Sequence, residues 1–464
     1  MAQGSQGASL SGGAEGKKNE GAARPARSLS PRQTLFVGVT LFSMFFGAGN
    51  LILPPLLGVQ AGAESLPAIL GFFVTGVGLP VLGIVVVALS GTLRDLATRV
   101  HPVFARVFVA LVYLAIGPCL AIPRTASTAF EMLAPLLPAG VSLELARLAF
   151  SVAFFAVAFV LALHPGRLTR LLGRITGPAL IALIVVVVVS ALASLPGMAP
   201  APAPVAPYDG APAVAGFLTG YQTMDLLASL TFGLVIATNV RALGLTAPRD
   251  VTRAVCGAGV VAGALMMAVY GGLCVVGYAL SAELPSATNG AVVITASATA
   301  RFGLAGTVIV AAIFLLACLN VCIGLISCCG SYFAEEIPCV SYRACALAFA
   351  AFSCVVSNLG LDAIISFSAT LLGALYPPAI VLVAMGLLRR RFDAVPMSWP
   401  WTVGVTVVLS AAVALRDALA PHLALPLDAL PLADVGLGWV LPAVAVAALS
   451  SVASALLRRR AARA

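Results

Sequence analysis

The chain has 464 residues, of which 61% are hydrophobic and 9% are charged, and its mean hydropathy is +1.08. Soluble domains are about 45–50% apolar and about 25% charged, so this composition excludes a soluble globular protein and predicts one that crosses a membrane many times. The formal net charge of +9 comes from Lys and Arg in the tails and between apolar stretches, a placement that indicates membrane topology and argues against nucleic-acid binding.

The two ends of the chain are polar and basic. Residues 1–33 are rich in Gly, Ala and Ser, carry five Lys or Arg residues, and predict a disordered cytoplasmic tail. The apolar stretch that follows is long enough to span a bilayer, which the core of a secretory signal is not. Residues 458–464 predict a second basic cytoplasmic tail.

Twelve apolar stretches between these tails predict twelve membrane-spanning helices and an all-α fold. They cover about residues 34–57, 66–90, 103–123, 145–163, 172–195, 215–240, 251–280, 302–333, 342–359, 362–388, 399–418 and 436–457. With the N-terminus in the cytoplasm, only Arg124, Arg147, Arg301 and Arg416 among the 26 Lys and Arg residues fall on the external side. This positive-inside bias predicts that both termini are cytoplasmic.

A Pro/Ala-rich external loop over residues 196–214 divides the first ten stretches into two sets of five. We therefore expect a first five-helix repeat at 34–195, a second at 215–390, and two additional helices at 399–457. The first stretch of each set runs through the membrane in the opposite direction to the other, so the predicted relation is an inverted repeat, as in many secondary transporters.

The first apolar stretch is interrupted by the motif FFGAGNLILPP, residues 45–55. Gly47 and Gly49 lack the Cβ that favours a helix, Asn50 adds an amide, and the two prolines cannot donate a backbone hydrogen bond. Irregular backbone at membrane depth persists only where protein buries it or where it lines a wet cavity. Free N–H groups at such a break attract an anion and free carbonyls a cation. The alternative is that the glycines only allow close helix packing.

The sixth stretch contains a second interruption, GYQTMDLLASLTFG, residues 220–233. Its acidic residue, Asp225, is costly near the middle of a bilayer, and such residues usually mark a functional site. Asp225 is expected to orient the broken helix, to bind a cation or to meet a substrate amine. The alternative is that it only caps the start of a half-helix.

Other polar residues in the apolar stretches have two open interpretations each. Arg124 is predicted at an external mouth, paired with Glu131 as a structural or gating pair. Tyr376 precedes two prolines and is expected either in an external gate or at a plain proline kink. Asn320 is either a contact between helices or a ligand.

The sequence lacks the motifs of the main alternative chemistries. No GxxxxGK[ST] motif is present, and the two lysines of the chain both lie in the N-terminal tail, so we expect no ATPase activity and no lysine-bound cofactor. No Ser/His/Asp grouping indicates a hydrolase, and the ten cysteines lack the paired spacing of a zinc site. We therefore expect neither an enzyme nor a metal cofactor.

Four segments of the chain resemble the branched-chain amino acid:cation symporters of bacteria. They are LFSMFFGAGNLILPPLLGVQAG, AIGPCLAIPRTASTAFE, GYQTMDLLASLTFG and LLGALYPPAIVL, and the similarity extends from about residue 34 to 390. The resemblance implies a fold related to the leucine transporter and import of leucine, isoleucine and valine with a coupling ion, usually Na⁺. It also implies a location in the bacterial inner membrane, with the amino acid and the lipid bilayer as the partners and no ATPase partner.

The resemblance further implies where the substrate is held. Its carboxylate would meet the N–H groups of Ala48 and Gly49, and its amine would meet carbonyls of the two interrupted stretches. The implied substrate-site residues are Phe46, Gly47, Ala48, Gly49, Asn50, Met224, Asp225 and Leu226.

The implied sodium site departs from the family pattern. Its residues are Ser43, Phe46, Ala317 and Asn320. The family carries two threonines in LACLTT, where this chain has Asn320 and Val321. Valine offers no oxygen, and hard cations prefer oxygen ligands. Na⁺ coupling is therefore expected with H⁺ coupling as the alternative; a transporter for another neutral amino acid and a membrane amino acid sensor are further alternatives.

Overall fold

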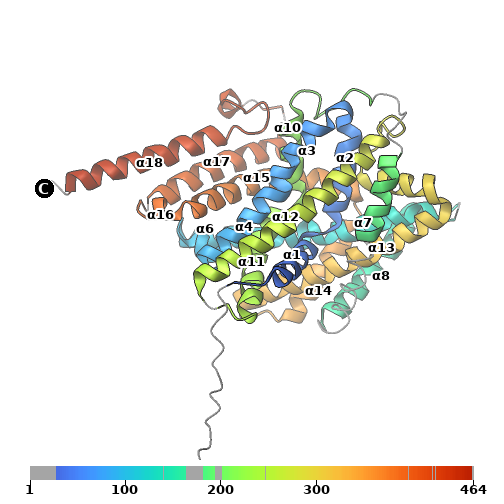
Figure 1. Ribbon diagram of the computed structural model, residues 1–464, viewed down its shortest axis with the longest axis horizontal. Helices are drawn as coiled ribbons and strands as arrows, with labels where there is room; N and C mark the ends of the chain where they lie inside the picture. The colour runs from blue at the N-terminus through green and yellow to red at the C-terminus, as the bar shows by residue number, and fades with distance from the viewer. Residues whose placement is uncertain are drawn as a thin grey trace, which may run out of the picture.

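The computed structural model describes residues 28–138, 140–163, 181–193, 201–245, 247–395, 397–420, 422–423 and 425–461. Within these ranges every regular element is a helix (Figure 1), which confirms the predicted fold class. Most of the predicted N-terminal tail, and the loop basic residues Arg167, Arg170 and Arg174, lie outside the described residues.

Helices make up most of the described ranges, and a longer, mostly irregular segment lies between Leu419 and Val440. Their bounds are α1 (Pro31–Phe45), α2 (Ala48–Ala61), α3 (Ser65–Phe73), α4 (Leu79–Ser90), α5 (Leu93–Thr98), α6 (Pro102–Leu114), α7 (Ala121–Leu133), α8 (Leu143–Ala162), α10 (Pro212–Thr219), α11 (Asp225–Ala242), α12 (Pro248–Ala279), α13 (Gly290–Glu336), α14 (Tyr342–Ser357), α15 (Leu361–Leu387), α16 (Arg389–Phe392), α17 (Ser398–Leu419) and α18 (Val440–Ala461). Short π-helical turns at Val74–Gly78 and Ala115–Cys119 join α3 to α4 and α6 to α7.

Seven segments of the described chain are long and apolar enough to cross a membrane. They are Ala48–Ser90, Pro102–Leu136, Leu143–Ala162, Pro248–Ala279, Gly290–Glu336, Leu361–Leu387 and Ser398–Leu419. The first and sixth predicted stretches are absent from this set as single helices because each is divided, at the motifs discussed above. The total of twelve crossings and the inverted repeat remain predictions.

The helix α13 is longer than its predicted span at 302–333 because it continues through a kink. Gly303 has φ 58° and ψ −151°, a backbone conformation that L side chains rarely adopt. Residues 290–302 therefore form a separate helical arm before the kink, which the apolar pattern did not predict.

Helices α2 and α12 are in direct backbone contact. A Cβ atom on Gly277 would overlap the carbonyl oxygen of Pro55, and one on Gly58 would overlap that of Cys274. Small residues at a helix crossing allow this approach, which is typical of membrane bundles. The contact fixes the half-helix that follows the first interruption against a long, continuous helix.

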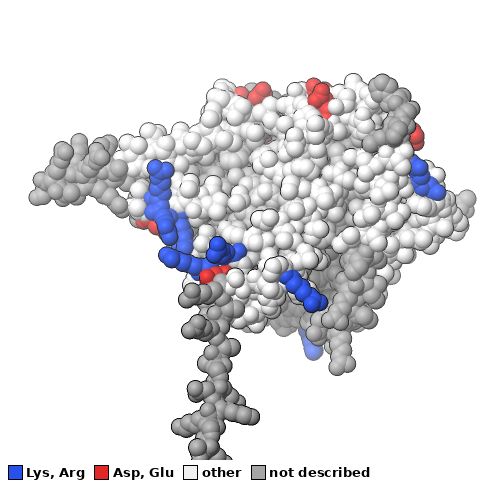
Figure 2. All heavy atoms as spheres, viewed as in Figure 1, with Lys and Arg blue, Asp and Glu red and all other residues white. Residues whose placement is uncertain are grey.

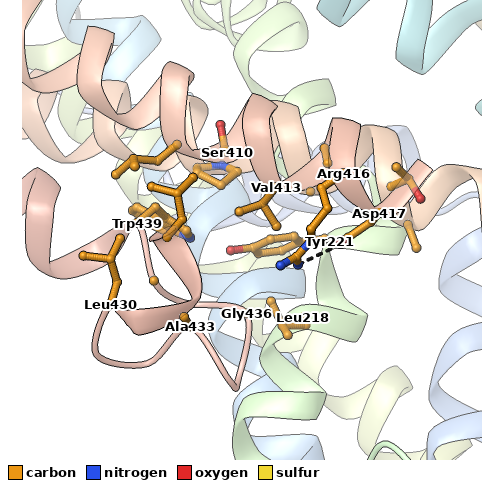
Figure 3. A pocket seen from close by; sticks show the side chains of 18 of the residues that line it. Leu218, Tyr221, Ser410, Val413, Arg416, Asp417, Leu430, Ala433, Gly436 and Trp439 are labelled. Atoms are coloured by element: carbon orange, nitrogen blue, oxygen red, sulfur yellow. Dashed lines mark hydrogen bonds and ion pairs between the residues drawn. The ribbon is translucent and has the colours of Figure 1, made fainter. Parts of the chain in front are cut away.

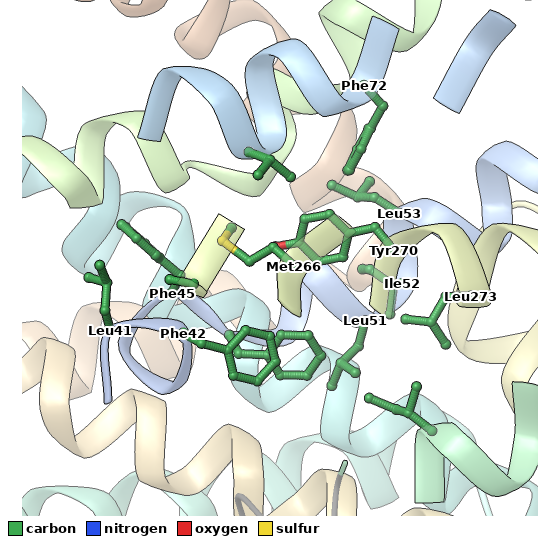
Figure 4. Close-up of a cluster of buried hydrophobic side chains, with 14 of the residues drawn as sticks. Leu41, Phe42, Phe45, Leu51, Ile52, Leu53, Phe72, Met266, Tyr270 and Leu273 are labelled. Atoms are coloured by element: carbon green, nitrogen blue, oxygen red, sulfur yellow. The ribbon is translucent and has the colours of Figure 1, made fainter. Parts of the chain in front are cut away.

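A cluster of buried apolar side chains surrounds the same region (Figure 4). Phe42 and Phe45 come from α1, Ile52 from α2, Phe72 from α3 and Tyr270 from α12. The ring of Phe72 packs edge-on against that of Tyr270 with centroids 5.5 Å apart. The cluster holds both parts of the divided first stretch to α12.

Charge is distributed unevenly over the bundle. On the face seen in Figure 2, Lys and Arg side chains gather at the lower left beside a few acidic ones, and further acidic side chains lie along the upper edge. We call the first of these the basic end, where α4 and α11 end and α12 begins, and it carries the ion pairs Arg94–Glu336 (2.9 Å) and Arg99–Asp393. The asymmetry agrees with that expected from the loops.

Candidate functional site

The first interruption lies between α1 and α2. Phe46 has φ −75° and ψ 94°, and Gly47 has φ −119° and ψ −173°, so both are extended between two helices. The N–H of Gly47 donates to Oδ1 of Asn50 at 3.3 Å, which caps the start of α2. The predicted break in the first stretch is confirmed.

The second interruption lies between α10 and α11. A 3₁₀ turn covers Gly220–Thr223, and Met224 then adopts a left-handed conformation with φ 63° before α11 begins at Asp225. Left-handed backbone is costly for a non-glycine residue, so the surrounding packing must hold it there. The sixth stretch is broken as predicted, and the break itself occupies residues 220–224.

A buried hydrogen-bonded cluster joins the two breaks. Nδ2 of Asn50, in the first turn of α2, donates to Oδ2 of Asp225 at 2.7 Å, and it also contacts the Tyr270 hydroxyl. That hydroxyl donates to the same Asp225 oxygen at 3.2 Å. Asn50, Asp225 and Tyr270 are each at most 2% exposed. Because a buried carboxylate is costly without partners, these donors account for how Asp225 is tolerated there.

A cavity of about 560 Å³, here named the central cavity, lies beside this cluster. Its walls are formed by the two breaks together with α7 and α13. They include Thr40, Ser43, Met44, Phe45, Gly47, Ala48, Gly49, Asn50, Ile116, Ala121, Arg124, Thr125, Thr223, Met224, Asp225, Ala228, Asn320, Val321, Gly324, Leu325 and Cys328. The volume falls within the range of small-molecule sites, and the mixture of apolar walls with a few polar groups is typical of them.

The central cavity extends from the breaks toward the basic end. Ser43 precedes the break on α1, Ala228 follows the break on α11, and Cys328 lies on α13 toward its end at the basic end. On the other side of the breaks the rings of Tyr221 and Tyr376 stack with centroids 4.3 Å apart. The structure therefore has a cavity on one side of the breaks and a closed aromatic contact on the other.

A second cavity of about 310 Å³, here named the peripheral cavity, lies beside the second break (Figure 3). Tyr221 and Gln222 line this cavity, whereas Thr223 lines the central one. Tyr221 lies in its wall together with Arg416 and Asp417 of α17 and Trp439. Arg416 pairs with Asp417 at 2.8 Å and with Asp428. The backbone N–H of Leu425, followed by the Arg416 guanidinium, holds the pKa of Asp428 below its usual value. The charged groups of this cavity thus satisfy one another.

The predicted pairing of Arg124 with Glu131 is wrong. Arg124 is 3% exposed and lines the central cavity, where Nη1 donates to the carbonyl of Gln222 at 2.6 Å. Glu131 instead lies 3.8 Å from Arg147 of α8. Seven residues along a helix correspond to about 10 Å, so one ion pair cannot easily join the two positions, and α7 turns Arg124 toward the second break.

The other predicted site residues divide into two groups. Gly47, Ala48, Gly49, Asn50, Met224 and Asp225 line the central cavity, as do Ser43 and Asn320. Phe46 and Leu226 are buried in apolar clusters, and Ala317 packs against one of them. The hydroxyl of Ser43 donates to the Val39 carbonyl at 3.0 Å. The structure therefore brings most of the proposed ligands to one cavity.

Sequence reasoning missed Tyr270. It is one of two tyrosines in the long apolar helix α12 and has no motif around it. The signal that could have found it is weak: a tyrosine hydroxyl that is buried in an apolar span needs a hydrogen-bond partner, and Asp225 was an acceptor without an assigned partner.

Comparison with known proteins identifies relatives over nearly the whole chain. A family model described as branched-chain amino acid transport protein matches residues 30–457. The branched-chain amino acid permease BraB of Bacillus subtilis is 37% identical over 430 residues, covering 92% of this chain and 96% of the relative. The branched-chain amino acid transport system 3 carrier protein of Pseudomonas aeruginosa is 37% identical, with 93% and 98% coverage. The permease BrnQ of Escherichia coli is 36% identical, with 91% and 96% coverage.

Solved structures of transporters share the fold at much lower sequence identity. The inward-facing conformation of Mhp1 superimposes with a TM-score of 0.53 at 14% identity, covering 92% of this chain and 91% of that one. A mutant form of the manganese transporter of Eremococcus coleocola gives a TM-score of 0.55 at 14% identity, covering 91% and 95%. These matches confirm the expected transporter fold.

Proposed function

Since this chain belongs to the branched-chain amino acid transport protein family, whose members are membrane transporters and not enzymes, we propose that it imports leucine, isoleucine and valine by cation symport. The observation that carries the proposal is the central cavity, where two broken helices meet at a buried Asn50–Asp225 hydrogen bond. The setting is the bacterial cytoplasmic membrane with both termini inside, in line with the positive-inside bias of the loops.

The central cavity suits a zwitterion with an aliphatic side chain. The start of α2 offers backbone N–H groups to a carboxylate, and the end of α1 offers carbonyls to an amine. The side chains of Met44, Ile116 and Leu325 form apolar parts of the wall. Burying the aliphatic part of the substrate there contributes about 25 cal/mol for each Å² removed from water.

Transport requires the cavity to open alternately to each side of the membrane. In this arrangement the cavity extends toward the basic end, and the Tyr221–Tyr376 stack closes the other side. We assign Tyr376 to the external gate that separates in the opposite arrangement. Glu131, paired with Arg147, is not part of that stack.

Two ions are candidates for coupling. Ser43 and Asn320 both line the central cavity, and Cγ1 of Val321 lies 3.8 Å from a Cβ built on Gly47, so α13 passes close to the end of α1 where a Na⁺ ion would bind. Asp225 favours the second candidate, H⁺, because it is a buried carboxylate that faces the same cavity.

Uptake of labelled leucine into proteoliposomes tests the proposal, with Na⁺ and pH gradients imposed separately. We expect an inward Na⁺ gradient to accumulate leucine, and excess isoleucine or valine to compete with it. Equal accumulation when choline replaces Na⁺, together with stimulation by an inward proton gradient, would overturn Na⁺ coupling in favour of H⁺. Absence of leucine uptake under every gradient would overturn the transport proposal.

A further inference from the structure

Arg124 is a buried cation whose donors are not all used. It is 3% exposed on α7, and its Nη1 donates to the carbonyl oxygen of Gln222 at 2.6 Å. Nε has no hydrogen-bond partner, and within the described residues no carboxylate lies within ion-pair distance of the guanidinium. Asp225 lines the same cavity, but its carboxylate is hydrogen-bonded to Asn50 and Tyr270 and makes no ion pair with Arg124. The guanidinium therefore keeps hydrogen-bond donors for a further anion.

The guanidinium lies against the first turn of α2. A Cβ atom on Gly49 would overlap Nη2 of Arg124 and would lie 2.9 Å from Cζ. Only glycine fits at this position without displacing the guanidinium. Gly49 is in the first turn of a 14-residue helix, where backbone N–H groups have no acceptor within the helix. Two different sources of positive potential, a helix start and a side-chain cation, therefore meet at one point of the central cavity wall.

We propose that Arg124 is a ligand of the substrate carboxylate, which it binds together with the backbone N–H groups at the start of α2. The inference rests on the proposed function and names one residue of the same site. The free Nε–H and the Nη2 group lie on one edge of the planar guanidinium, which is the edge that pairs with a carboxylate through two parallel hydrogen bonds. Nη1 remains on the Gln222 carbonyl, so the same side chain connects the substrate to the second break.

This arrangement explains charge balance in the cavity. When Asp225 is ionised, it accepts hydrogen bonds from Asn50 and Tyr270, and its charge balances that of Arg124. A zwitterion adds no net charge to this pair. A leucine analogue without its carboxylate would leave Arg124 unpaired beside an additional cation, so the site should reject leucinamide and leucinol.

Binding to the purified full-length protein in detergent provides the test, with labelled leucine as ligand and unlabelled leucinamide as competitor. We expect the wild-type protein to bind leucine at least about 100-fold more tightly than leucinamide. Arg124→Gln should weaken leucine binding about 10- to 100-fold, as expected for loss of a charge-assisted pair, and should leave leucinamide binding almost unchanged. The leucine affinity of Arg124→Lys should lie between those of the wild type and Arg124→Gln, because lysine keeps the charge but lacks the planar guanidinium.

Arg147→Gln is the matched control, because Arg147 lies on α8 and is not among the residues that line the central cavity. The ratio of its leucine affinity to its leucinamide affinity should equal that of the wild type. If the wild type binds leucine and Arg124→Gln, eluting as a monodisperse species, keeps the wild-type ratio, Arg124 is not a carboxylate ligand. If the wild type does not bind leucine, the proposed function fails and this inference falls with it.

Gly49→Ala keeps the question testable should Arg124→Gln not fold. The added methyl group pushes Nη2 aside without removing the charge, so the ratio should fall for this variant as well. A folded Gly49→Ala protein with the wild-type ratio would overturn the inference.

Discussion

The central and peripheral cavities both border the turn at Gly220–Thr223, yet their charged groups are partnered in different ways. In the peripheral cavity Arg416 is held by Asp417 and Asp428, at the protein surface. In the central cavity Arg124 has an unpaired Nε and faces a helix start. A cavity whose charges satisfy one another has little to offer a charged ligand, whereas the central cavity has donors left for one.

Among substitutions in the two cavities, Asp225→Asn is expected to have the largest effect on leucine uptake. Asp225→Asn removes the charge that accepts from Asn50 and Tyr270 and places an amide N–H₂ near the Asn50 amide. Charge-assisted hydrogen bonds contribute about 1.5–3 kcal/mol each, so we expect the initial rate of leucine uptake to fall about 100-fold. Uptake is compared at equal amounts of inserted protein.

Asp362→Asn is the control for this substitution, because Asp362 accepts a hydrogen bond from Asn289 at 3.2 Å in the first turn of α15, away from the central cavity. Its uptake should remain close to that of the wild type. Unchanged uptake in Asp225→Asn would reduce the role of Asp225 to that of a helix cap.

A smaller effect on leucine uptake is expected from alanine substitutions of the two glycines in the first break, and it should differ between them. A Cβ on Gly49 overlaps Arg124, whereas the nearest atoms to a Cβ on Gly47 lie 3.8 Å away, and the extended backbone of Gly47 is accessible to any residue. Overpacking costs about 1–3 kcal/mol, so Gly49→Ala should slow leucine uptake about tenfold and Gly47→Ala less than about threefold. Equal losses in the two variants would mean that both glycines serve only the break.

Gly47 and Gly49 also show what the sequence could and could not predict. The breaks were predictable because glycines, Asn50 and prolines in an apolar stretch conflict with a continuous helix. The different surroundings of Gly47 and Gly49 depend on where α7 places Arg124, which no local pattern contains. The same limit explains the incorrect Arg124–Glu131 pair, because the two positions lie about 10 Å apart along the helix axis, and only the fold shows which groups of other helices each of them meets.

Within the described chain, the left-handed residue of the second break illustrates a further limit. The motif contains Gly220, which has the freedom to adopt φ > 0, but the positive φ falls on Met224, a buried apolar residue. On either side of Met224 the chain is held by tertiary contacts, since α11 packs against α4 and the ring of Tyr221 stacks on that of Tyr376. Local conformational preference would place the positive φ on Gly220, so tertiary packing and not local preference determines that it falls on Met224.

The coupling ion gives a smaller test inside the central cavity. Val321 lines the cavity close to the first break, and Val321→Thr adds a hydroxyl oxygen there with little change in volume. If Na⁺ binds between α1 and α13, we expect the Na⁺ concentration for half-maximal leucine uptake to fall about threefold, since one more oxygen ligand becomes available. Val308→Thr, on the same helix but 46% exposed, is the control and should leave that concentration unchanged. A response of the same size in both variants would argue against a Na⁺ site at this position.

The smallest effect is expected in the peripheral cavity, at Arg416. Its ion pairs join Arg416 to carboxylates that are 41–49% exposed, and water and salt screen pairs of this kind, so they contribute little to stability. Arg416→Gln should therefore lower the melting temperature in detergent only slightly and change leucine uptake less than about twofold. A loss of uptake as large as that of Asp225→Asn would show that the paired charges beside Tyr221 take part in the transport cycle, and the contrast between a satisfied and an unsatisfied cavity would then not distinguish the functional site.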